Sequence, residues 1–181
     1  MTLLNKWRIA GILTLTLSGF LFHYVYSWSG NSRIIGLIAP VNESVWEHLK
    51  LGFWAVVLFS AAEYSQLKNK VSNYFFARMA GILSLELTIL SIFYSYTMIS
   101  GHSILWIDIL SYVLGVIAGQ YITHFLFRRN PLPAFLNRLG LATIIVLGIV
   151  FAVLTCYPPH SGLFKDPNNH SYGIMKKISK K

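Results

Sequence analysis

The stretch from Ile104 to Phe127, ILWIDILSYVLGVIAGQYITHFLF, is apolar over a length that matches the thickness of a membrane. A helix needs about 20 predominantly apolar residues to cross the hydrocarbon core of a bilayer. Four further apolar runs cover residues 9–28, 49–62, 79–100 and 139–156, and the second reaches a comparable length only when Val45 and Trp46 are added. The sequence therefore predicts an all-α, polytopic integral membrane protein with about five transmembrane helices.

The overall composition supports this fold class. Of the 181 residues, 55% are hydrophobic and only 12% are charged. A soluble domain of this length has too little interior to bury so much apolar sequence. We expect a single transmembrane helical bundle over residues 1–157, followed by a tail over residues 158–181.

The basic residues predict how the bundle is oriented. They flank alternate ends of the apolar runs, and the flanking residues are Lys6, Arg8, Lys68, Lys70, Arg78, Arg128, Arg129 and Arg138. One intervening turn is expected to hold only Arg33 and Lys50. By the positive-inside rule, the N-terminus is then cytoplasmic and the C-terminal tail is extracytoplasmic. Because the basic residues form no continuous patch, a nucleic-acid partner is not expected.

In this orientation, most of the acidic, histidine and amide side chains lie at the outer side of the membrane. An ionisable group inside a bilayer costs a few kcal/mol or more, so each one needs an explanation. The polar residues placed near the outer side are His23, Asn42, Glu43, Glu47, His48, His102, Asp108, His160, Asp166 and His170. This gathering predicts a polar site that faces the outer leaflet.

A zinc site is one interpretation of the outer cluster. Catalytic zinc takes three protein ligands and keeps a water molecule, which becomes acidic enough to attack a substrate near neutral pH. The candidate metal ligands are His23, His48, Asp108 and His160. Glu43 and Glu47 are the candidate catalytic residues, either of which would act as general base. No HExxH or HxxxH spacing is present, so this interpretation depends on clustering alone.

The segment around Glu43 also has a structural interpretation. Ser44-Val-Trp-Glu47 matches a capping box, in which Ser44 accepts from the N–H of Glu47 and the Glu47 side chain reaches back. If the helix includes Glu43, then Glu43 and Glu47 share one face, and His48 is turned away by about 140°. A site would then use Glu43 with Glu47, or His48 with residues from other helices.

Two polar residues lie within apolar helices on the same side. The structural alternative for His23 is a hydrogen bond to a neighbouring tyrosine or a backbone carbonyl. Asp108 shares a helical face with Gly115 and Gly119, which form a GxxxG stripe typical of close helix packing. We therefore expect Asp108 to face other helices of the bundle.

The remaining acids lie nearer the inner side. The preferred interpretation of Glu86 is an inner ion-pair network, whose members would be Glu63, Glu86, His124 and Arg78 or Arg128. The alternative is a path for protons or ions that joins the inner and outer acids.

The tail is expected to be an ordered extracytoplasmic segment. Pro158 and Pro159 end the last helix, and residues 166–169, Asp-Pro-Asn-Asn, predict a turn. Leu163, Phe164 and Tyr172 are candidates to dock the tail on the membrane face. It would then lie as a lid over the outer cluster and deliver His160.

Two resemblances follow from these motifs. Residues 40–50, PVNESVWEHLK, together with Tyr157-Pro-Pro-His160 and Asp166-Pro167, resemble a family of small uncharacterised bacterial multi-pass membrane proteins. Residues 42–48, NESVWEH, are also similar to a signature of the progestin and adipoQ receptor family and the related alkaline ceramidases. That second resemblance is confined to this segment, and it implies a zinc site and hydrolysis of lipid amides.

Two functions therefore remain open for a protein of the bacterial inner (plasma) membrane. One is a metal-dependent membrane hydrolase that acts on a lipid at the outer leaflet. The other is a non-enzymatic protein, either a small transporter or channel subunit or a partner of another membrane complex. The sequence contains no nucleotide-binding loop, serine-elbow motif or cofactor fingerprint that would favour another class.

Overall fold

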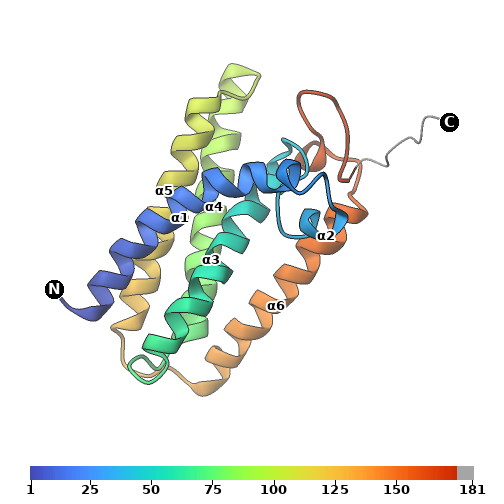
Figure 1. Ribbon diagram of the computed structural model, residues 1–181. Helices are drawn as coiled ribbons and strands as arrows, with labels where there is room; N and C mark the ends of the chain where they lie inside the picture. Colours follow the sequence, from blue (N-terminus) through green and yellow to red (C-terminus); the bar gives the residue numbers. More distant parts are fainter. Residues whose placement is uncertain (175–181) are drawn as a thin grey trace.

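The computed structural model describes residues 1–174 and confirms an all-α architecture. Five long helices form one bundle (Figure 1): α1 (Leu3–Trp28), α3 (Val45–Leu67), α4 (Tyr74–Ser100), α5 (Leu105–Phe127) and α6 (Ala134–Cys156). Two short elements, α2 (Arg33–Gly36) and the 3-10 turn η1 (Gly162–Phe164), lie outside it. The end of the predicted tail, including the lysines at positions 176, 177, 180 and 181, lies outside the described residues.

Each of the five predicted apolar runs forms the greater part of one long helix. Four of these helices, α1, α4, α5 and α6, are long and apolar enough to cross a membrane. The fifth, α3, is more polar and packs against α1, α4 and α6. Lys50 lies in α3. The prediction that Lys50 lies in a turn is therefore wrong, because the helix already begins at Val45.

Helices α4 and α5 form the closest pair of the bundle. Gly115 and Gly119 are both buried in α5. A Cβ atom at Gly119 would lie 2.6 Å from the carbonyl oxygen of Gly81, and one at Gly115 would lie 2.9 Å from that of Leu85. The absence of side chains at these positions therefore lets the two backbones touch, which confirms that the GxxxG stripe faces protein.

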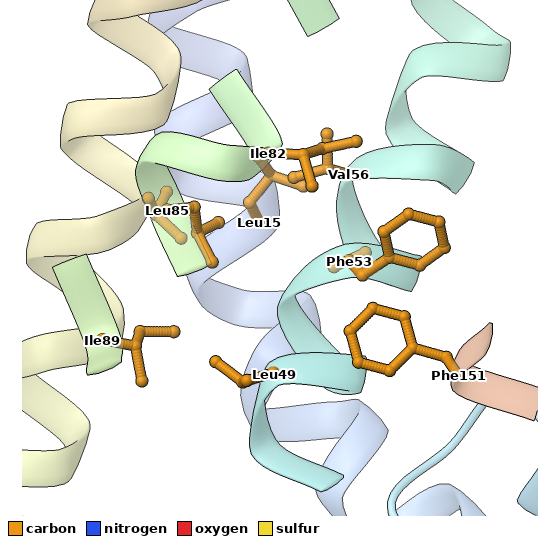
Figure 2. Packing of buried hydrophobic residues seen from close by; sticks show 10 residues of the cluster. Leu15, Leu49, Phe53, Val56, Ile82, Leu85, Ile89 and Phe151 are labelled. Atoms are coloured by element: carbon orange, nitrogen blue, oxygen red, sulfur yellow. The ribbon is translucent and has the colours of Figure 1, made fainter. Parts of the chain in front are cut away.

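The apolar core runs through the centre of the bundle and receives side chains from all five long helices. Figure 2 shows its members: Leu15 from α1, Leu49, Phe53 and Val56 from α3, Ile82, Leu85 and Ile89 from α4, and Phe151 from α6. Val116 of α5 is also buried in this cluster. The core fixes the lateral positions of the helices whose ends carry the polar residues.

The two ends of the bundle differ in chemistry. At one end, here called the site end, lie the last turn of α1, helix α2, the first turn of α3, the α4–α5 turn and the tail (Figure 1). At the opposite end, here called the basic end, lie the N-terminus and the α3–α4 and α5–α6 loops. The segments that carry the histidines and acids predicted for the outer side therefore lie at the site end.

One buried ion pair of the bundle lies towards the basic end. Glu63 of α3 accepts hydrogen bonds from Arg78, whose Nε lies 2.9 Å from its carboxylate, and from the hydroxyl of Tyr74 at 3.1 Å. The predicted inner network is wrong for Glu86, whose two carboxyl oxygens are buried without a hydrogen-bond partner among residues 1–174. The physical reason is distance, because Glu86 lies eight residues beyond Arg78 on α4, about 12 Å along the helix. His124 and Arg128 form no ion pair with these residues either.

Candidate metal centre

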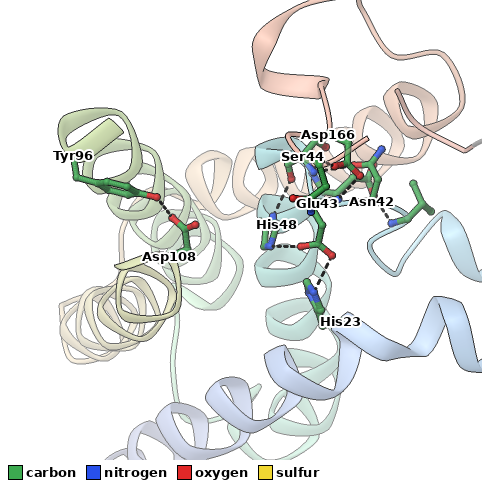
Figure 3. A network of polar contacts seen from close by, with 11 residues as sticks. His23, Asn42, Glu43, Ser44, His48, Tyr96, Asp108 and Asp166 are labelled. Carbon is green, nitrogen blue, oxygen red and sulfur yellow. Dashed lines mark hydrogen bonds and ion pairs between the residues drawn. The ribbon is translucent and has the colours of Figure 1, made fainter. Parts of the chain in front are cut away.

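Three of the predicted site residues converge at the site end of the bundle. Nε2 of His23, on α1, lies 3.1 Å from one carboxylate oxygen of Glu43. Nε2 of His48, on α3, lies 3.6 Å from the other carboxylate oxygen (Figure 3). One ligand atom from each of the three residues lies within 4.8 Å of the other two. This group, His23, Glu43 and His48, is the candidate metal centre.

Glu43 can reach both histidines because it precedes helix α3. Ser44 is the N-cap, and its hydroxyl accepts from the backbone N–H of Glu47 at 3.4 Å, as the capping box predicts. The second bond of the capping box, from the N–H of Ser44 to the Glu47 side chain, is not formed. The N–H of Ser44 donates to the side-chain oxygen of Asn42 at 2.9 Å. Glu43 therefore lies in the turn before the helix, and the expectation that it shares a helical face with Glu47 is wrong.

The tail holds the loop that carries Glu43. The backbone N–H of Glu43 donates to the carboxylate of Asp166 at 3.2 Å, and Asp166 itself is only 2% exposed. The same carboxylate accepts from the N–H of Asn168 at 2.7 Å, which closes the predicted turn. Phe164 of η1 packs on Trp46, with ring centroids 4.9 Å apart. Tail and loop thus form one hydrogen-bonded unit beside the metal centre.

The His48 ring is fixed by a hydrogen bond that decides its tautomer. Its Nδ1 lies 3.0 Å from the carbonyl oxygen of Ser44. Because a carbonyl oxygen can only accept, Nδ1 carries a proton, and in the neutral ring Nε2 then holds the lone pair. A backbone carbonyl on the second ring nitrogen is the usual partner of a histidine that ligates a metal.

The three side chains are partly accessible to solvent. Their exposed fractions are 32% for His23, 42% for Glu43 and 37% for His48. The hydrogen bond from His23 lowers the pKa of Glu43 and is the largest effect. Partial burial raises this pKa, whereas positive charge on His23 and His48 lowers it further. Glu43 is therefore available as a carboxylate at neutral pH, in a place that small molecules can reach.

Glu47, the second predicted catalytic residue, lies in a different network. Its carboxylate lies 2.5 Å from the ammonium of Lys50 and accepts from Thr155 at 2.9 Å and from the N–H of Val41 at 3.0 Å. Lys50 also donates to the carbonyl of Gly36 at 2.6 Å. Both charged side chains are buried, so this network joins α3, α6 and the loop after α2 in the interior.

The other predicted ligands are not part of the three-residue group. Asp108 accepts a hydrogen bond of 2.5 Å from the hydroxyl of Tyr96, and Figure 3 shows this pair on α5 and α4, beside the metal centre. His160 is exposed and stacks on Tyr172, with ring centroids 4.6 Å apart. His102 is exposed in the turn between α4 and α5.

Comparison with known proteins identifies a family but no activity. The model of a family described as "Family of unknown function (DUF6512)" matches residues 1–174, so the chain belongs to this family. No curated protein and no solved structure matches the chain. Membership over nearly the whole chain agrees with the sequence resemblance to an uncharacterised family. The chemistry of the site itself must therefore carry any functional assignment.

Proposed function

We propose that this member of the DUF6512 family holds a divalent transition-metal ion, zinc in the first instance, between His23, Glu43 and His48. The convergence of three ligand atoms from separate segments carries this proposal. Zinc bonds of about 2.0–2.1 Å in tetrahedral geometry place neighbouring ligand atoms about 3.3 Å apart. The two histidines lie 3.1 Å and 3.6 Å from different oxygens of Glu43, and one ligand atom from each residue lies within 4.8 Å of the others, so the side chains would have to draw closer to hold an ion.

The arrangement of His48 and Glu43 also favours a cation between them. When the His48 ring is neutral, the lone pair on its Nε2 faces the Glu43 carboxylate at 3.6 Å, too far for a hydrogen bond. Two electron-rich groups in this arrangement repel each other unless a proton or a metal ion lies between them. A single zinc ion satisfies both groups and replaces the proton that His23 shares with Glu43.

Hydrolysis is the chemistry that such a centre would perform. Two histidines and one carboxylate leave a coordination position for water, and zinc lowers the pKa of that water to near 7. Asp108, which lies on α5 and faces the side of the bundle that carries His48, is the candidate general base. Glu47 is not available for this role, because it forms an ion pair with Lys50. Apolar helices surround the site end, which supports a lipid of the plasma membrane's outer leaflet as the substrate.

The metal content of the purified protein tests this proposal. We expect wild-type protein, prepared in detergent without added metal or chelator, to contain close to one zinc, iron or manganese ion per chain. His23→Ala and His48→Ala should each lower metal affinity by more than the roughly 10–100-fold that loss of a second-shell partner costs. Elemental mass spectrometry on protein of verified monodispersity measures this.

His102→Ala and His160→Ala are the matched controls, because both histidines lie at the same end but outside the three-residue group. Both controls should keep the wild-type metal content. A metal-free wild-type protein that is well folded and takes up no added zinc would contradict the proposal, as would equal metal loss in the controls.

A second candidate function, transport of protons or cations, is favoured by Glu86. Its carboxyl group is buried in the middle of α4, and both oxygens lack a hydrogen-bond partner. Intramembrane carboxyl groups of this kind often mark proton or ion pathways. In liposomes, Glu86→Gln should then abolish proton flux and leave the metal content unchanged. Flux equal to that of protein-free liposomes for the wild type would contradict this function.

A further inference from the structure

A polar cavity of about 350 Å³ lies at the basic end of the bundle, the end opposite the metal centre. It is bounded by the last turn of α3, the α3–α4 loop, the first turn of α4 and the first turn of α6. The polar groups that line it are Tyr64, Lys68, Asn69, Lys70, Ser72 and Asn137. No carboxylate belongs to this lining.

Asn137 is one of the residues that line this cavity, and its amide oxygen is already hydrogen-bonded. Its oxygen accepts from the backbone N–H of Phe75 at 2.8 Å and from that of Phe76 at 3.2 Å. Because both partners are donors, the amide oxygen is fixed at the start of α4. The Asn137 NH₂ group is then left with two N–H donors, and it makes no hydrogen bond to the part of the chain that the structure describes.

The charge of the cavity is uncompensated. Lys68 and Lys70 are exposed, and neither forms an ion pair within residues 1–174. The acid nearest in sequence, Glu63, is bound to Arg78 in the interior. The cavity thus offers two ammonium groups, a fixed amide donor and a serine hydroxyl, and this combination matches an anion with several acceptor oxygens.

We propose that this cavity binds the phosphate headgroup of an anionic phospholipid. It lies where α3 ends and where the membrane-length helices α4 and α6 begin, which is the level of lipid headgroups. Basic pockets between transmembrane helices are known to take such headgroups. The proposal uses none of the residues of the metal centre and is independent of it.

Retention of lipid by the purified protein tests this site. Protein in detergent is exposed to phosphatidylglycerol or to phosphatidylcholine, and bound lipid per chain is measured by native mass spectrometry. The wild type should retain phosphatidylglycerol in preference. K68Q/K70Q should weaken this retention about 30-fold, which corresponds to about 1 kcal/mol for each lysine.

Asn137→Asp is the sharper variant. The aspartate keeps an oxygen for the N–H groups of Phe75 and Phe76, so helix α4 should still begin normally, but it replaces the amide donor with a negative charge. Phosphatidylglycerol retention should fall at least as far as in K68Q/K70Q, without loss of thermal stability. R128Q/R129Q is the matched control, because it removes the same charge at the same end and neither arginine lines the cavity.

Three results would overturn the proposal. The first is equal retention of the two lipids by the wild type, and the second is wild-type retention of phosphatidylglycerol by N137D. The third is an equal loss in R128Q/R129Q, which would indicate a general effect of charge. A further arm adds inorganic phosphate at millimolar concentration: full displacement of the lipid would assign the cavity to free phosphate instead of a headgroup.

Discussion

Glu63→Gln should lower the free energy of unfolding by about 3–5 kcal/mol, because Arg78 then stays buried without a counter-charge. Both residues are only 1% exposed, and Arg78 forms no other ion pair within residues 1–174. Tyr74 would also lose the carboxylate to which it donates. Denaturant unfolding in detergent micelles, followed by circular dichroism, measures the change.

Glu86→Gln is the matched control for this experiment, since it makes the same substitution at another buried glutamate. The Glu86 carboxyl group has no ionic partner, so its replacement leaves no charge uncompensated. We expect a change of less than about 1 kcal/mol, in either direction. A loss for Glu86→Gln as large as that for Glu63→Gln would show that the assignment of the ion pairs is wrong.

Glu47→Gln should be comparably destabilising, by about 3–5 kcal/mol, because it leaves the ammonium of Lys50 unpaired at 0% exposure. Glu47 also accepts from the N–H of Val41, in the loop that leads to Glu43. We therefore expect the single variant to lose metal as well as stability. Unfolding and metal content measured on the same preparation report both effects.

The double variant Glu47→Gln/Lys50→Met distinguishes a structural role of Glu47 from a direct role at the metal centre. Removal of both charges restores most of the lost stability, because the remaining side chains are neutral. If Glu47 only supports the loop, the double variant should also regain metal. Recovery of stability without any recovery of metal binding would contradict the account and would assign Glu47 a direct role at the centre.

The helices could be predicted from the sequence because membrane insertion depends on long apolar runs. Each run lies within one long helix or nearly so, and four of the five helices begin four to six residues before their run, whereas α5 begins one residue after the start of its run. The glycine stripe predicted that this helix packs closely against another helix, because small residues let two backbones approach, but it did not predict that the partner is α4. Lys50 was misplaced, because a lysine in an apolar run resembles a helix boundary unless its partner Glu47 is recognised.

The candidate site could be predicted only in part. Helix depth placed His23, Glu43, His48 and Asp108 at one end, but depth does not determine which side chains meet. Glu43 turned towards the histidines because Asn42 and Asp166 bind the backbone around it, and Asp166 is 123 residues away in sequence. Tyr96, which binds Asp108, and Thr155, which completes the Glu47 network, have no distinguishing pattern in the sequence.

The zinc K-edge X-ray absorption spectrum of zinc-loaded protein reports the metal ligands themselves. We expect a first shell of nitrogen and oxygen at about 2.0–2.1 Å, with scattering from two imidazole rings and no sulfur at about 2.3 Å. His48→Ala should lower the imidazole count to one. A spectrum without imidazole scattering, or one that keeps two imidazoles in both His23→Ala and His48→Ala, would contradict a metal centre formed by His23, Glu43 and His48.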